Sequence, residues 1–256
     1  MPPDASLLDY LLRLADTDLV LAQRLGEWVG KGPVVEEDIA STNVGLDLLG
    51  QARMWYGYAG EVEARIAGTG RDEDAFAFRR DAHEFRNLLL VEQPNGDYAD
   101  TLARQFLFDQ WHLLLLRALS ASADERVAGI AAKAAKEAAY HAERSADWVI
   151  RLGDGTDVSH ARMQDAIDGL WMYTGEMFTA APAGDPLAAA GIAVDPAMLK
   201  APWDARVSAV LAEATLARPA DGWMQKGGIA GVHTEHLGRL LAEMQFLQRA
   251  YPDAKW

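Results

Sequence analysis

Carboxylates and histidines at helical spacing are the residues of this sequence that could hold a pair of metal ions. Helix bundles that bind two irons supply a carboxylate from each of two helices and a Glu-x-x-His motif from each of the other two. Histidine is needed because an imidazole nitrogen completes each iron, while carboxylates bridge and neutralise the pair. The chain has 38 acidic residues but only 6 histidines, so the positions of the histidines decide whether such a site can form.

The expected hairpin with its turn near Ala123 carries part of this set. Residues equally far from the turn of an antiparallel helix pair lie at the same height, which places Asp109 level with Glu137. Three residues after Glu137, where the motif requires histidine, stands Tyr140. His141 follows and leans towards the same apolar stripe, so we interpret it as a core histidine that hydrogen-bonds Glu137 or another buried polar group.

The expected hairpin with its turn near Pro33 lacks a suitable histidine as well. Here Asp47 occupies the glutamate position of the motif, and Gly50, which offers no side-chain ligand, occupies the histidine position. On the first helix, the residue level with Asp47 is near Leu19, beside Asp18. The carboxylates are therefore partly present while both histidines are missing, which predicts an eroded metal site.

Six positions make up this eroded site: Asp18, Asp47, Gly50, Asp109, Glu137 and Tyr140. We predict that it binds no metal and that the chain contains no catalytic or cofactor-binding residue. Inward carboxylates without iron would repel one another. Some are therefore expected to stay protonated or to pair with Arg53, Arg104 or Lys136.

A second place where a metal could bind is the pair His233 and His236, three residues apart. We favour a structural role for this segment, because Thr234 is a good N-cap and Glu235 suits the first turn of a helix. His141, His233 and His236 are the fallback ligands if the chain does bind a metal.

The apolar spacing is helical almost throughout, and no convincing alternating strand pattern occurs. The expected helices cover residues 7–25, 36–67, 72–90, 97–120, 124–152, 158–178, 205–217 and 234–252. Two helix pairs, each with a short turn and joined by a longer segment, are typical of a ferritin-like bundle with one crossover. We predict an all-α single domain over 1–256, a ferritin-like four-helix bundle (about 5–152) with additional C-terminal helices (156–256).

The composition restricts the kinds of partner. The net charge of −14 disfavours nucleic acid and anionic membranes and suits a basic protein partner, although acidity also simply keeps a protein soluble. Without cysteine, disulfides, zinc–thiolate sites, iron–sulfur clusters and cysteine nucleophiles are excluded. No export leader opens the chain, and the longest aliphatic run, Leu113–Leu116, is too short to span a bilayer. We therefore expect a cytoplasmic protein.

The segment 85–96 combines a hydrophobic run with dense polar groups. It is expected either to face a partner or to end a helix in a hydrogen-bonded turn. Most of the 8 tryptophans belong to the core by their spacing, and any left outside would mark an interface.

Several long motifs resemble a known family. The segments that carry the resemblance are Glu36–Ala40, Leu46–Arg53, Leu90–Trp111, Tyr140–Gly155 and His233–Gln248. They are similar to the C subunit of phenylacetyl-CoA 1,2-epoxidase, a bacterial multicomponent monooxygenase of phenylacetate degradation, over nearly the whole chain.

The resemblance implies a structural, non-catalytic subunit in a hetero-oligomer. It implies a ferritin-like catalytic A subunit that carries the di-iron centre and the substrate, and that this chain stabilises. It also implies a small B subunit and a reductase with flavin and an iron–sulfur cluster. The assembled enzyme would epoxidise the ring of phenylacetyl-CoA with O2 and NADPH, and this chain would hold no cofactor.

Two alternatives remain open. The chain could itself be a ferritin-like metal oxidase or oxygenase with a degenerate di-metal site made of Asp47, Asp109, Glu137 and His141. It could also be a binding module for a small apolar ligand, in which case a continuous cavity near Gly50 is expected.

Overall fold

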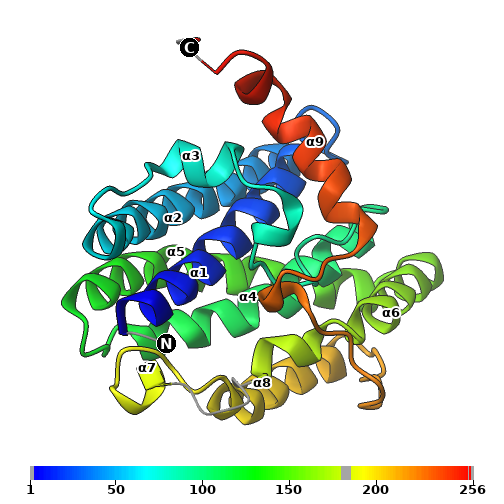
Figure 1. Cartoon of the computed structure of the whole chain (residues 1–256). Coiled ribbons are helices and arrows are strands. Elements are labelled where there is room, and N and C mark those ends of the chain that lie inside the picture. Colours follow the sequence, from blue (N-terminus) through cyan, green and yellow to red (C-terminus); the bar gives the residue numbers. More distant parts are fainter. Residues whose placement is uncertain (1–2, 180–185, 253, 255–256) are drawn as a thin grey trace. The chain divides into compact units, whose positions relative to one another are not determined.

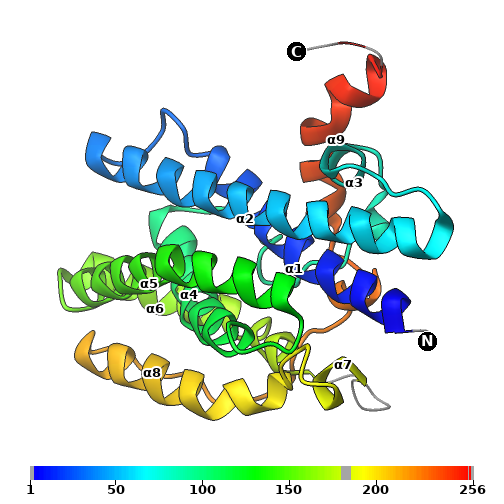
Figure 2. The same cartoon turned by 90° about the vertical axis from the view of Figure 1, so that its left-hand side faces the viewer.

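The computed structural model describes residues 3–179, 186–252 and 254. Over these residues the chain is all-α and contains no strand, as predicted (Figures 1 and 2). The backbone divides into two compact units, one made of residues 1–94 and 227–256 and the other of residues 95–226. Each unit contains one hairpin of two long helices, while the prediction of a single domain stays a prediction.

The first unit is built on the hairpin of α1 (Pro3–Gly26) and α2 (Val35–Ala67). α3 (Glu73–Phe78), a 3-10 helix over Ala82–Glu84 and α9 (Glu235–Ala250) complete it, with a second short 3-10 helix over Gly228–Ala230. In Figure 1 the dark blue α1 and the lighter blue α2 run side by side. α2 stops at Gly68, whose φ of 81° is the left-handed C-cap that glycine adopts without strain.

The second unit is built on α4 (Tyr98–Leu119) and α5 (Glu125–Gly153), followed by α6 (Asp157–Trp171). The remaining elements are a 3-10 helix over Thr174–Phe178, α7 (Pro186–Ala189), a 3-10 helix over Pro196–Leu199 and α8 (Lys200–Glu213). α4 begins with a reciprocal capping box, in which Asp97 accepts from the Asp100 amide and Asp100 from the Asp97 amide. Asp124 is the N-cap of α5, and its side chain accepts hydrogen bonds from the amides of Arg126 and Val127.

The long helices agree with their predicted ranges to within a few residues, but the helix predicted over 72–90 is wrong. α3 ends at Phe78, and residues 85–97 are not helical. The reason is that the buried polar side chains of this segment bond to backbone groups instead of leaving the backbone to a helical ladder. Asn87 Nδ2, for example, donates to the Leu88 carbonyl at 3.1 Å, and Gln93 Nε2 donates to the Leu89 carbonyl at 2.8 Å.

Two further helix predictions are corrected at their ends. The helix expected over 158–178 gives way after Trp171 to a 3-10 helix over Thr174–Phe178, and the helix expected over 205–217 runs instead from Lys200 to Glu213. Part of the loop expected over 179–201 lies outside the described residues. Within the part of the chain that the structure describes, no helix is long and apolar enough to cross a membrane.

Candidate functional site

The inward faces of α2 and α5 are rotated by one residue from the predicted register. On α5 the buried stripe includes Ala138 and His141, while Glu137 is half-buried and Tyr140 is 55% exposed. Counting from the turn gives a height along a helix but not the direction in which a side chain leaves it. Tyr140 is therefore not an inward residue. The inward position that the count assigned to Tyr140 is held by His141.

The same shift occurs on α2. Its buried stripe includes Leu48 and Gln51, while Asp47 is half-buried and Gly50 is exposed. A methyl group added at Gly50 would meet no atom within 4 Å. The expectation that Gly50 leaves a bare inward position is therefore wrong, because the inward position three residues after Leu48 holds the amide of Gln51.

Two predicted carboxylates are buried. Asp18 on α1 is 2% exposed and Asp109 on α4 is 1% exposed. Of the predicted basic partners, Arg53 pairs on the surface with Glu73 at 3.4 Å, and Arg104 donates to Asn95 at 2.7 Å. Lys136 is exposed.

A buried polar cluster joins α4 and α5 within the second unit. Asp109 Oδ1 accepts a hydrogen bond from Gln105 Nε2 at 2.7 Å. Burial raises the pKa of Asp109 to about 6, although nearby His141, Ser145 and Gln105 act to lower it. The carboxyl therefore holds its proton to a higher pH than an ordinary aspartate does.

His112 lies in the same part of α4, one turn after Phe108, on whose ring it packs with centroids 4.8 Å apart. Burial, together with the nearby His141, lowers the pKa of His112 to about 3. The ring is therefore neutral under ordinary conditions, which is the form that packs against an aromatic side chain without a charge penalty.

The donor sets of the two hairpins do not fit a di-iron centre. Where the motif has Glu-x-x-His, α5 offers Ala138 and His141 and α2 offers Leu48 and Gln51. The inward glutamate is thus replaced by an aliphatic side chain on both helices, and one of the two imidazoles by an amide. Among the described residues, no group of three or more histidine, aspartate or glutamate side chains is arranged to hold a metal ion.

A second buried cluster, which the sequence reasoning missed, lies in the first unit. Arg80 forms an almost fully buried ion pair with Asp16, with side chains 2% and 0% exposed, and Tyr56 donates to the same carboxylate. Burial alone would lower the pKa of Arg80, but Asp16 raises it overall. Burial and Asp16 raise the pKa of Tyr56 well above its ordinary value, so this is a structural ion pair with a neutral phenol.

His233 belongs to a third cluster, around the buried carboxylate of Glu92. Its Nδ1 lies 3.0 Å from Glu92 Oε2 and its Nε2 lies 3.0 Å from the Phe85 carbonyl. Glu92 also accepts from the Thr234 amide at 2.7 Å. Both ring nitrogens therefore face oxygen atoms, which leaves neither of them directed at a metal position.

The predicted helix-start roles of Thr234 and Glu235 are confirmed. Thr234 is the N-cap of α9 and accepts from the His236 amide, and Glu235 lies in the first turn. The segment 85–96 is mostly buried and holds α9 through Glu92. Its unusual density of polar groups was the only signal of this role in the sequence.

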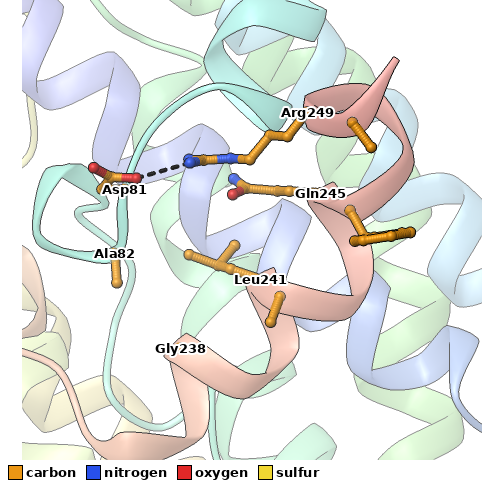
Figure 3. Close-up of a pocket in the computed structure, with 9 residues that line it drawn as sticks. Asp81, Ala82, Gly238, Leu241, Gln245 and Arg249 are labelled. Carbon is orange, nitrogen blue, oxygen red and sulfur yellow. Dashed lines mark hydrogen bonds and ion pairs between the residues drawn. The ribbon is translucent and has the colours of Figure 1, made fainter. Parts of the chain in front are cut away.

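A groove of about 500 Å³ lies between α9 and the segment before the first 3-10 helix (Figure 3). Arg249 crosses it to Asp81 at 2.9 Å, and Gln245 donates to the carbonyls of Ala77 and Arg80. Arg249 also donates to the Arg80 carbonyl at 2.7 Å. These bonds fasten α9 to the segment that delivers Arg80 to its buried partner, so the groove has a structural explanation.

Another groove of about 500 Å³ lies among α4, α5 and α8. Its buried Gln110 donates to the Ala142 carbonyl at 2.7 Å and accepts from Arg206 at 3.2 Å. Neither groove includes Gly50 or any other predicted site residue. The cavity near Gly50 that a small-ligand module would need is therefore not supported by either groove.

Two hairpins of long helices, whose inward positions hold carboxylate, amide and imidazole groups, define an all-α protein of the ferritin-like class. Residues 2–256 match the phenylacetic acid catabolic protein family, and the chain belongs to that family. It is 54% identical over 247 residues to the C subunit of the 1,2-phenylacetyl-CoA epoxidase of Escherichia coli (strain K12), an alignment that covers 96% of this chain and 98% of the relative. The family resemblance predicted from the motifs is confirmed.

Proposed function

We propose that this chain is the structural C subunit of a phenylacetyl-CoA 1,2-epoxidase, and that it pairs with and stabilises a catalytic A subunit. The observation that carries the proposal is the donor set of α2 and α5, where Leu48 and Ala138 stand at the glutamate positions of the di-iron motif. A chain that keeps the bundle and lacks these ligands has the shape of a catalytic relative without its chemistry. The extensive identity to a protein named as a subunit supports the same conclusion.

In this proposal the chemistry belongs to other chains of a cytoplasmic hetero-oligomer. The A subunit holds the di-iron centre and the substrate, and a small B subunit and a reductase with flavin and an iron–sulfur cluster complete the system. The overall reaction uses O2 and NADPH to epoxidise the aromatic ring of phenylacetyl-CoA. This chain contributes packing, and its buried Arg80–Asp16 ion pair and the hydrogen bonds of Glu92 keep its own helices in place.

Co-expression with the A subunit tests the proposal. A tag on the A subunit is expected to retain this chain through purification, and native mass measurement should give a hetero-oligomer. The purified chain should not turn over phenylacetyl-CoA by itself, even with the reductase present. Turnover by this chain without the A subunit, or failure of the two chains to copurify, would overturn the proposal.

One observation favours a second candidate, a ferritin-like oxidase with a degenerate metal site. Asp109 and His141 are both buried, and they lie close enough for His141 to act on the pKa of Asp109. Both residue types bind iron and manganese. Replacing His141 with alanine separates the candidates, since an oxidase would lose metal and activity while a structural subunit would retain its pairing with the A subunit.

A further inference from the structure

α2 carries a stripe of large aliphatic side chains on its exposed face. Val35, Ile39, Leu46 and Leu49 are 70%, 56%, 59% and 40% exposed. At 100° per residue their spacing confines them to an arc of about 80°, and at 1.5 Å per residue they extend over about 21 Å. We call these four residues the α2 stripe. Thr42 lies within the same arc, and its hydroxyl is already bonded to the Asp38 carbonyl at 2.8 Å.

The opposite face of α2 is also apolar, and it is buried. That face includes Val44, Leu48 and Trp55, none more than 2% exposed. A surface helix of a globular protein normally pairs one apolar face with one polar face, and a helix that is apolar on both sides is normally covered on both. α2 therefore has the pattern of a helix that is covered by protein on two opposite faces.

α5 provides the comparison within the same chain. It too has a buried stripe, but its exposed positions are dominated by charged and small residues, among them Ala132, Lys133, Lys136, Glu143 and Asp147. Across this helix, all of which the structure describes, Tyr140 is the one large hydrophobic residue that is exposed. Of these two long helices only α2 has an apolar exposed face, which points to α2 rather than α5 as the contact face.

We infer that the α2 stripe is the docking surface for a helix of the catalytic A subunit, an inference that rests on the function proposed above. A straight ridge about 21 Å long fits the groove between the side-chain rows of a packed helix. A stable interface needs about 800 Å² from each partner. The stripe therefore forms the apolar centre of the contact, and polar residues around it form the rim.

Charge decides between this partner and a second copy of the chain. Glu36 and Glu61 are exposed along α2, its exposed arginines Arg53 and Arg65 are each paired with a carboxylate, and the whole chain carries a net charge of −14. Two copies that met through the stripe would bring like charges together, which costs free energy at an interface. The same charge repels an anionic lipid surface. The partner helix should therefore present an apolar ridge flanked by lysine or arginine.

The first test uses matched pairs of substitutions in the co-expressed complex. Leu46→Asp with Leu49→Asp is expected to weaken binding of the A subunit by at least about tenfold, because it places two charges at the apolar centre of the contact. Ala132→Asp with Tyr140→Asp adds the same charge to α5 and should leave binding unchanged. If the aspartate pair prevents folding, Leu46→Gln with Leu49→Gln gives the same readout without added charge.

The second test labels the surface directly. Because the chain has no cysteine, Leu49→Cys and Lys133→Cys each introduce a single reactive thiol. Alkylation at position 49 should be at least about tenfold slower in the complex than in the free chain, because a residue at the centre of the contact is shielded from solvent there. Alkylation at position 133 should not change.

The outcomes separate the two proposals. If the wild-type chain copurifies with the A subunit but the α2 variants bind equally well and position 49 stays reactive, the docking surface is wrong and the proposed function stands. If the wild-type chain does not copurify, the proposed function fails and the docking inference falls with it. If the free chain is a dimer that the α2 substitutions dissociate, a second copy occupies the stripe and the inference is overturned.

Discussion

Gln105 Nε2 donates a hydrogen bond of 2.7 Å to Asp109 Oδ1, one turn further along α4. A carboxylate of this helix is one that a ferritin-like di-iron protein would direct at its metals. Here an amide of the same helix takes up one of its oxygens, and burial favours the protonated acid. The side chain has thus become part of the core of the protein, and its titration can be measured.

Asp109→Asn should remove a pH dependence of stability. The folded state raises the pKa of this carboxyl from 3.8 to about 6. Its stabilising contribution is therefore complete below about pH 4 and is lost as the pH rises through about 6. We expect the free energy of unfolding of the variant, relative to wild type, to increase by about 2 kcal/mol between about pH 4 and about pH 8. Urea denaturation at several pH values measures this difference.

His112 has the opposite effect on the pH dependence of stability, but it is present in both wild type and Asp109→Asn. Burial lowers its pKa to about 3, so His112 favours folding as the pH rises, and this term cancels when the variant is compared with wild type. A difference between the two proteins that stays flat with pH would show that Asp109 does not hold its proton.

Arg80→Met should strongly destabilise the first unit. The substitution leaves the Asp16 carboxylate buried without its cationic partner, which costs about 3–5 kcal/mol. Arg65→Met is the matched control, because Arg65 pairs with Asp4 on the surface, where both side chains are 45% exposed and a salt bridge contributes at most about 1 kcal/mol. Equal losses in urea denaturation would contradict the account of the buried pair. Adding Asp16→Asn to Arg80→Met should recover part of the loss, since the buried charge is then removed.

Glu92→Gln should loosen the start of α9. Glu92 accepts hydrogen bonds from the Thr234 amide at 2.7 Å and from Asn87 at 3.0 Å, one on each oxygen. The glutamine amide can keep only one of these hydrogen bonds, because its nitrogen would face a donor instead of offering an acceptor. Losing the other bond should cost about 1–3 kcal/mol. Hydrogen exchange of the first amides of α9 should therefore accelerate. Glu235→Gln, at an exposed position of the same first turn, should change exchange much less, and similar rates in the two variants would argue against the role of Glu92.

Two glycines of α2 should respond in opposite ways to alanine. A methyl group at Gly60 would collide with the Arg71 carbonyl oxygen, whereas one at Gly50 meets nothing within 4 Å. Gly50→Ala is expected to stabilise the free chain by up to about 1 kcal/mol, since alanine is the better helix former. Gly60→Ala should destabilise it despite the same propensity gain. Thermal unfolding of the two variants tests the close approach of residue 71 to α2, and a Gly60→Ala variant as stable as wild type would contradict it.

The sequence predicted the long helices well because their ends carry local signals. Asp97 and Asp124 cap α4 and α5, and Gly68 ends α2. Rotation about the helix axis was harder to predict. A symmetric count from each turn gave Asp47 and Glu137 as inward residues, whereas burial selects the neighbours one step further along the chain.

The buried polar clusters could not be predicted because their partners are far apart in the sequence. Asp16 pairs with Arg80, which is 64 positions further along the chain. Glu92 meets His233 across 141 residues. A polar residue in an apolar run indicates that some partner is needed, but only the fold determines which one. The helix over 72–90 was predicted for the same reason, because the sequence does not show what the polar residues of this segment bond to.

Iron content tests the central claim most directly, since a subunit without a metal centre should stay free of iron whatever the supply. The chain should be expressed alone in iron-supplemented medium, desalted, and measured by elemental analysis beside Asp109→Asn and His141→Ala. We expect far less than one iron per chain, with no difference among the three proteins. A stoichiometric pair of irons in the wild type, lost in both variants, would contradict the account of a chain that supports catalysis without a metal centre of its own.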